Sequence, residues 1–157
     1  MKKFFIMLIL ATMCMITYST EVVKGIDWNM SKSEVKRVLD NKQLSQEEEN
    51  ELSYKDIQVR DERIVLDQKL DLVSFRFKNN KLYSINGIIT RVRNKDNIPV
   101  FMDIMKKCMT NEGSVEVKVT SDNMRNVMNK KYYYGCGLSY TQELMDLFVI
   151  YYNPADF

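Results

Sequence analysis

Only a few types of side chain in this sequence could take part in catalysis or bind a metal. The sequence of 157 residues holds three cysteines, Cys14, Cys108 and Cys136, and it holds no histidine. Without histidine the usual Ser–His and Cys–His pairs are excluded, so a hydrolase would need a Ser–Lys or a paired-carboxylate centre. Serine, lysine and carboxylate side chains are common along the chain, but their presence alone does not identify a centre. We therefore predict no catalytic residue.

No metal or cofactor site is predicted either. A zinc site needs more nitrogen or sulfur ligands than two lone thiols supply. The acidic stretch QLSQEEEN, residues 43–50, lacks the Asp/Asn alternation and the central glycine of a calcium-binding EF-hand loop. Met102, Met105 and Met109 could bind copper(I), which prefers thioether ligands, but packing of an apolar helix face explains their spacing better.

Cys108 and Cys136 are predicted to form a disulfide. An even pair of cysteines in a small exported domain is typical of such a bond. Cys108 falls on the apolar stripe of an expected helix, and Cys136 alternates in phase with the apolar residues of an expected strand, so the two side chains can meet. The alternative is a pair of buried free thiols that pack as small apolar groups.

A secretory signal peptide is predicted at residues 1–20. Two lysines precede an apolar run over residues 4–16, and small polar residues follow. The run is shorter than the ~20 apolar residues that span a bilayer. Cleavage would leave a single α+β domain, residues 21–157, that is periplasmic or secreted. Two alternatives place the protein at the membrane: a retained leader, or a lipid anchor on Cys14 that holds it in the envelope.

The charge balance argues against nucleic acid as a partner. The whole chain has 23 basic and 21 acidic residues, and two of the basic residues, Lys2 and Lys3, lie in the predicted signal peptide. Without that peptide the chain has 21 basic and 21 acidic residues and no formal net charge. A surface that binds nucleic acid needs a clustered excess of lysine and arginine. The basic stretch over residues 90–95 is followed at once by Asp96 and is typical of a solvated loop.

The stretch GIDWNMSKSEVKRVLD, residues 25–40, predicts the start of a short helix. Ser31 and Glu34 have the spacing of a capping box, in which each side chain accepts a hydrogen bond from the backbone N–H of the other. Trp28 is the single tryptophan and lies just before this start. We expect its ring to cover the gap between helix and sheet, and a ligand platform is the alternative.

Alternating apolar residues predict strands on both sides of a second helix. The strands are expected within residues 52–59, 69–90, 115–119, 132–138 and 147–151, and Asn79-Asn80 is expected at the turn of a hairpin. A phase break near Asp56 predicts a bulge. The second helix is expected to start at Asp96 or Asn97 and to end at Gly113. Residues 43–50 and 121–131 are expected to be loops or short helical turns.

These elements predict an α+β fold. The order is helix, about three strands, helix, about three strands. We expect a mostly antiparallel sheet of about five or six strands, with two main helices packed on it in the order αβββ-αβββ.

The helix start and the hairpin resemble small exported bacterial domains. The stretch G-I-D-W-N-M-S-K-S-E-V-K-R-V-L is similar to openings of the form W-G-M-S-x-x-x-V, and the hairpin has the form F-x-F-x-N-N-K-L-Y-x-I. In layout they resemble the BamE/SmpA outer-membrane lipoprotein domain and the β-lactamase-inhibitor-protein-like fold. The resemblance implies an α+β fold used as a binding or assembly module, with no catalytic residues.

Two functions from different classes are considered. The first is an exported, non-enzymatic bacterial envelope or secreted module that binds an envelope protein partner through a sheet face or edge. The second is a hydrolase of envelope material with a carboxylate or Ser–Lys centre. A sheet with exposed tyrosine and no convergent polar groups would favour the first function, and a buried polar cluster in a deep cleft would favour the second. We expect the first function.

Overall fold

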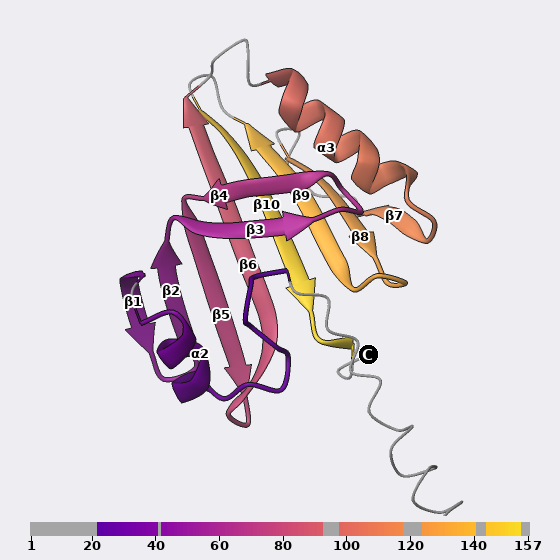
Figure 1. Cartoon of the computed structure of the whole chain (residues 1–157). Coiled ribbons are helices and arrows are strands. Elements are labelled where there is room, and N and C mark those ends of the chain that lie inside the picture. The colour runs from indigo at the N-terminus through magenta and orange to yellow at the C-terminus, as the bar shows by residue number, and fades with distance from the viewer. Residues whose placement is uncertain (1–21, 41, 93–97, 118–123, 141–143, 155–157) are drawn as a thin grey trace, which may run out of the picture.

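Antiparallel β-sheet makes up most of the structure. The computed structural model describes residues 22–40, 42–92, 98–117, 124–140 and 144–154. Eight strands form one antiparallel sheet in the order β1-β2-β5-β6-β10-β9-β8-β7, and two more form a separate hairpin (Figure 1). The elements in chain order are α2 (Lys32–Val38), β1 (Gln43–Glu48), β2 (Glu51–Lys55), β3 (Ile57–Asp61), β4 (Leu66–Leu70), β5 (Leu72–Lys78), β6 (Lys81–Val92), α3 (Ile98–Thr110), β7 (Ser114–Val117), β8 (Met124–Asn129), β9 (Tyr134–Tyr140) and β10 (Leu144–Tyr152).

The predicted fold class was wrong. The described residues hold ten strands and two helices, not about five or six strands with two main helices in the order αβββ-αβββ. The first of these helices, α2, is only seven residues long. Each half of the large sheet has four strands instead of three, and an inserted hairpin adds two more.

The missed strands have sequences without a clear alternating pattern. All six residues of β1 are exposed, so neither of its faces selects apolar side chains. β8 lies in the stretch that was expected to be a loop or helical turn, and it fully buries only Val127 and Asn129. Asp56 marks no bulge. With a φ of 57° it turns the chain out of the large sheet into the β3–β4 hairpin.

Two local predictions are confirmed. Asn79 and Asn80 form the turn between β5 and β6 with φ values of 52° and 58°, the positive range that a tight hairpin requires and asparagine tolerates. α3 begins at Ile98 and is followed by Gly113, which has a φ of 83°. The expected caps of this helix, Asp96 and Asn97, lie outside the described residues.

The large sheet consists of two four-stranded halves that meet in the middle. One half is β1-β2-β5-β6 and the other is β10-β9-β8-β7, and one helix precedes the strands of each half. β6 pairs with β10 along all nine residues of β10. The last strand of each half therefore lies at the centre of the sheet.

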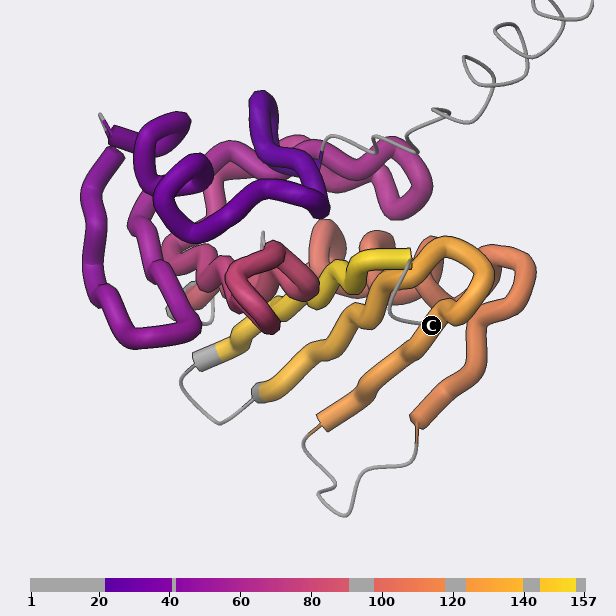
Figure 2. The backbone as a smooth tube through the Cα atoms, turned by 90° about the horizontal axis from the view of Figure 1, so that it is seen from below, coloured from indigo at the N-terminus to yellow at the C-terminus, as the bar shows by residue number. Residues whose placement is uncertain are grey.

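One face of the sheet is covered, and the core lies beneath the cover. Figure 2 shows α2, residues 22–30 and the β3–β4 hairpin on the same side of the sheet. α3 belongs to this side as well, because it is bonded to Cys136, and the strand partner of Cys136 is the buried Val149. We call this side the covered face.

Gly87 allows the hairpin to lie directly on the covered face. A Cβ atom at this position of β6 would come within 2.1 Å of Leu70 Cδ1. Leu70 ends β4 and is buried, so its side chain occupies the space that Gly87 leaves empty. A larger residue at position 87 would displace the hairpin from the sheet.

The helices of the structure are short. α3 has 13 residues, fewer than the ~20 that a bilayer requires. Among the residues described, no helix is long and apolar enough to cross a membrane. The predicted signal peptide, residues 1–20, and the alternative lipid site Cys14 lie outside the described residues.

Candidate functional site

The predicted helix start is present. Ser31 is the N-cap of α2, and its backbone N–H donates to Glu34 Oε2 at 2.8 Å while the backbone N–H of Glu34 donates to Ser31 Oγ at 3.4 Å. The hydrogen bond from the Ser31 backbone lowers the pKa of Glu34. Trp28 is 7% exposed and belongs to the hydrophobic core. These residues fix how the N-terminal segment lies on the sheet.

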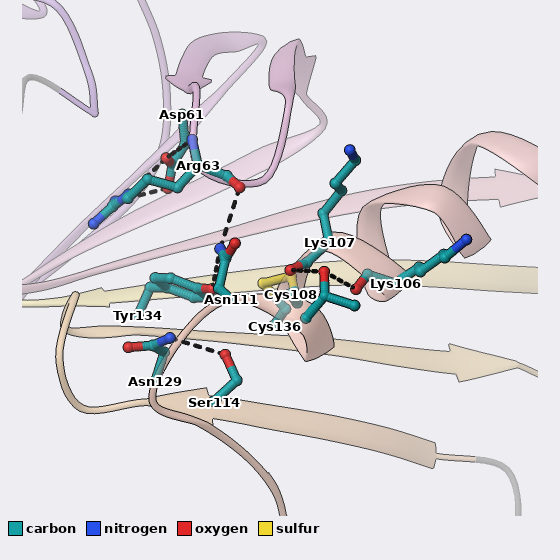
Figure 3. The surroundings of a disulfide bond; sticks show 11 residues. Asp61, Arg63, Lys106, Lys107, Cys108, Asn111, Ser114, Asn129, Tyr134 and Cys136 are labelled. Carbon is teal, nitrogen blue, oxygen red and sulfur yellow. Dashed lines mark hydrogen bonds and ion pairs between the residues drawn. A yellow bond between two sulfur atoms is a disulfide. The ribbon is translucent and has the colours of Figure 1, made fainter.

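Cys108 and Cys136 lie at disulfide distance, as predicted. Their Cα atoms are 6.6 Å apart, and the bond joins α3 to β9 across 28 residues of sequence (Figure 3). Both side chains are buried. The bond therefore holds α3 on the covered face of the C-terminal half of the sheet.

A buried ion pair lies close to this bond, in the turn between β3 and β4. Arg63 Nε donates to Asp61 Oδ1 and Nη2 donates to Asp61 Oδ2, both at 2.7 Å. The side chain of Asp61 is 2% exposed and that of Arg63 is 24% exposed. Arg63 Nη1 donates to the backbone oxygen of Tyr132 at 2.9 Å. Arg63 therefore ties the hairpin to the turn between β8 and β9.

Three tyrosine rings surround the Arg63 guanidinium. Its Cζ atom lies 6.0 Å, 5.2 Å and 5.9 Å from the ring centroids of Tyr132, Tyr134 and Tyr151. Burial lowers the pKa of Arg63, but the hydrogen bonds and charge of Asp61 outweigh it, so the pKa lies above the ordinary value. Burial, together with the negative charge of Asp61, raises the pKa of Tyr151 well above its ordinary value. Arg63 is charged and Tyr151 is neutral at pH 7.

An asparagine connects the ion pair to α3. Asn111 Nδ2 donates to the backbone oxygen of Arg63 at 3.2 Å and to the Tyr134 hydroxyl at 2.7 Å (Figure 3). Asn129 is fully buried and its Nδ2 donates to the backbone oxygen of Glu112 and to Ser114 Oγ. The bonds of Asn111 hold the β3–β4 turn against β9, and the bonds of Asn129 hold the segment between α3 and β7 against β8.

A pocket of about 410 Å³ opens beside Arg63 on the covered face. We call it the Arg63 pocket. It is lined by Trp28, Arg63, Lys131, Tyr132, Tyr133, Tyr151, Tyr152 and Pro154. Five of these eight residues are aromatic and two are cationic, and none carries a carboxylate. The volume lies in the range of small-molecule sites, ~300–1,000 Å³.

The opposite face of the sheet has no element over it among the described residues (Figure 2). We call it the open face. Two rows of cross-strand partners run along it. The first row is Leu72, Ile88, Phe148, Gly137, Asn126 and Val117. The second row is Ser53, Ser74, Asn86, Ile150, Gly135, Met128 and Val115. Neither row contains a charged residue.

Phe148 lies across the middle of the open face. A Cβ atom at Gly137 would come within 1.8 Å of Phe148 Cζ, so the ring occupies the space above this glycine. Ile88, the partner of Phe148 on β6, is 37% exposed, and Val115 and Val117 on β7 are 64% and 41% exposed. The first row is thus mostly apolar from Leu72 on β5 to Val117 on β7.

Two acceptor atoms on the open face have no hydrogen-bond partner among the described residues. They are Asn126 Oδ1, beside Phe148, and Asp146 Oδ1, two residues before Phe148 on β10. Buried polar atoms are nearly always paired in folded proteins. These two atoms are the exception on this face.

Metal-binding groups do not converge in the described part of the chain. No three His, Cys, Asp or Glu side chains lie close enough there to hold an ion. The buried Asp61 is paired with Arg63, and its negative charge also acts on the Tyr151 hydroxyl. The Arg63 pocket is therefore a candidate binding site.

The chain matches no protein family model, no curated protein and no solved structure in the comparisons made. The resemblance to BamE/SmpA-like and β-lactamase-inhibitor-protein-like domains stays a prediction. The function is therefore inferred from geometry.

Sequence reasoning missed both the Arg63 pocket and the open face. Arg63 and Tyr132 are 69 residues apart, and no local spacing predicts that they meet. The run Tyr132-Tyr133-Tyr134 is the sequence signal for this pocket. Successive side chains of a strand point to opposite faces, so three adjacent tyrosines cannot all be buried in the core, and at least one ring is available to line a surface site.

Proposed function

We propose that this protein is an exported, non-enzymatic module of the bacterial envelope, periplasmic or secreted, that binds a protein partner through the open face. The uncharged, largely apolar pair of rows across the sheet is the observation that carries the proposal. Contiguous apolar surface of this kind marks interaction sites on soluble proteins. A partner strand or helix laid on the rows would bury Ile88, Phe148 and Val117 together.

The composition of the open face supports a protein partner. Protein interfaces are enriched in aromatic residues and methionine and depleted of charge at their centre, and Phe148 and Met128 lie in the two rows. Charged residues flank the two rows: Arg76 Nε donates to Glu51 Oε2 at 2.8 Å on one side, and Asp146 lies in the next row of cross-strand partners on the other side. An apolar centre with a polar rim is the arrangement that interfaces favour.

The rigidity of the open face also supports binding. Ser53 and Ser74 are joined by a 2.6 Å hydrogen bond between their hydroxyls, and the covered face fixes the sheet from behind with the disulfide and the Arg63 network. A preformed surface loses little conformational entropy when a partner binds. The hydrolase alternative would have to use the buried polar cluster of Asp61, Arg63 and Tyr151 beside the Arg63 pocket, where the carboxylate is held in an ion pair with Arg63.

Site-specific photo-crosslinking in the native host tests the proposal. A photoreactive phenylalanine analogue at Ile88 on the open face should yield one discrete crosslinked protein. The same analogue at Met102 is the matched control, because Met102 is 47% exposed on α3 on the covered side. The control position should yield none of that product.

A charge variant completes the experiment. Ile88→Glu, supplied as untagged competitor, should fail to reduce the crosslink, whereas Met102→Glu should reduce it as well as the parent does, since a buried unpaired carboxylate opposes binding. Crosslinks that form equally at both positions, or competition by Ile88→Glu, would exclude the open face as the binding surface.

A further inference from the structure

The Arg63 pocket lies on the covered face, away from the proposed protein-binding surface. Its wall is made by the N-terminal segment at Trp28, the β3–β4 turn at Arg63, the β8–β9 turn at residues 131–133, and the end of β10 with Pro154. Four segments of the chain thus meet around one cavity. Hydrogen bonds from Arg63 to Asp61 and to the Tyr132 backbone hold two of these segments in place.

The charge that the pocket presents is positive. Arg63 and Lys131 line it, and no carboxylate does. Asp61 lies behind Arg63 and is 2% exposed, so it orients the guanidinium without facing the cavity. Glu112, which pairs with Lys131, has a side chain that is 77% exposed and does not line the cavity.

Donor groups remain for a ligand. The guanidinium has five N–H groups, and Asp61 and the Tyr132 backbone accept three of them. The other two have no partner among the described residues. The ring of the buried Tyr151 also lines the pocket. Unused donors held in fixed geometry favour an acceptor with charge.

The rest of the lining is aromatic. Tyr132, Tyr133, Tyr152 and Trp28 offer rings and ring edges, and Pro154 adds an apolar surface. Aromatic walls favour a flat or aliphatic body of similar size. A free phosphate or sulfate ion would leave this surface unused.

We propose that the Arg63 pocket binds a small organic carboxylate with an aromatic or aliphatic body. The carboxylate lies against the free N–H groups of Arg63 and near the ammonium of Lys131. The body of the ligand lies between the tyrosine rings and Trp28. This site is independent of the open face, and a ligand and a protein partner can be bound together.

Tryptophan fluorescence provides the test, because the chain has one tryptophan and it lines the pocket. Three probes of equal size are titrated into the folded protein: phenylpropanoate, phenylpropanol and phenylpropylamine. Phenylpropanoate should change the emission of Trp28 saturably, with a Kd below about 1 mM for a ligand of this size. The alcohol should bind at least about tenfold more weakly, since it lacks the charge that strengthens the hydrogen bonds. The amine should not saturate.

A conservative pair of lysine variants checks the site. Lys131→Gln should raise the Kd for phenylpropanoate about threefold, as expected for the loss of a partly exposed charge. Lys130→Gln is the matched control, because Lys130 is the adjacent exposed lysine and does not line the pocket. The Lys130→Gln variant should bind phenylpropanoate with the same Kd as the parent protein. Both side chains are exposed enough for the variants to fold.

Three results would overturn the proposal: no saturable change with phenylpropanoate, equal affinity for the alcohol, or equal effects of the two lysine variants. Ile88→Glu should leave the titration unchanged. Failure of the crosslinking experiment and failure of this one are therefore distinguishable.

Discussion

At the scale of single residues, the buried hydroxyl of Tyr151 has a consequence for stability. Burial and then the charge of Asp61 raise its pKa well above the ordinary value, so the folded state resists loss of this proton. A raised folded pKa gives stability that is complete below the unfolded pKa of about 10 and is lost as pH rises above it.

Tyr151→Phe should therefore remove part of the alkaline loss of stability. At pH 7 the free energy of unfolding of the variant should lie within about 3 kcal/mol of that of the parent, the upper range for the loss of one hydrogen bond to a charged group. Above pH ~10 its free energy of unfolding should fall less steeply than that of the parent. Urea unfolding followed by far-UV circular dichroism measures both. Equal pH dependence in the two proteins would contradict the assigned burial of the hydroxyl.

The residues predicted from sequence are those whose partners are close in sequence. Ser31 and Glu34 satisfy each other within one helical turn, so their spacing alone identifies the capping box. The Cys108–Cys136 pair was predictable because only two cysteines follow the leader. Arg63 has no such signal, because its tyrosine partners lie on strands whose pairing depends on the whole sheet.

At the scale of elements, the contact between β4 and β6 determines whether the hairpin stays on the sheet. Gly87→Ala should cost about 1–3 kcal/mol, since the new Cβ atom overlaps Leu70. Leu70→Ala alone should cost about 2–5 kcal/mol. The double variant should lose less than the sum of the two, because removing the Leu70 side chain makes room for the methyl group.

Gly135→Ala is the matched control for this cycle. A Cβ atom there would lie 3.6 Å from the Val127 backbone oxygen and 4.0 Å from Ile150 Cβ, which are ordinary contacts. Its effect should stay within about 0.5 kcal/mol. Chemical denaturation of the four variants measures the cycle, and strict additivity of Gly87→Ala and Leu70→Ala would show that the two side chains do not meet.

Elements were predictable where burial imposes a period on the sequence. β5 and β6 alternate because one of their faces packs against the core, and the asparagine turn between them was evident. β1 is exposed on both sides, so its strand conformation depends on pairing with β2 and not on its own residues. The prediction therefore gave about five or six strands, whereas the described residues form ten strands and a mostly antiparallel β structure.

At the scale of the whole molecule, the proposed export would account for both the predicted leader and the disulfide. Protein purified from its native host should have the mass of a chain cleaved after Ser19 or Thr20. Alkylation of the denatured, unreduced protein should modify neither Cys108 nor Cys136, which lie at disulfide distance. A mass that includes Met1, a diacylglycerol group on Cys14, or two alkylated thiols would contradict this account.

The position of β10 at the centre of the sheet affects when the protein can fold. β6 ends at Val92, but its second neighbour begins only at Leu144, after the whole C-terminal half has been made. During synthesis and translocation, one side of β6 keeps its backbone groups unpaired, and the apolar residues Ile85 and Ile89 lack their partners. Pairing over such a separation is slow. Under the proposed export, a chain with this strand order would benefit from being held unfolded until β10 has emerged, and we expect it to depend on chaperones for that reason.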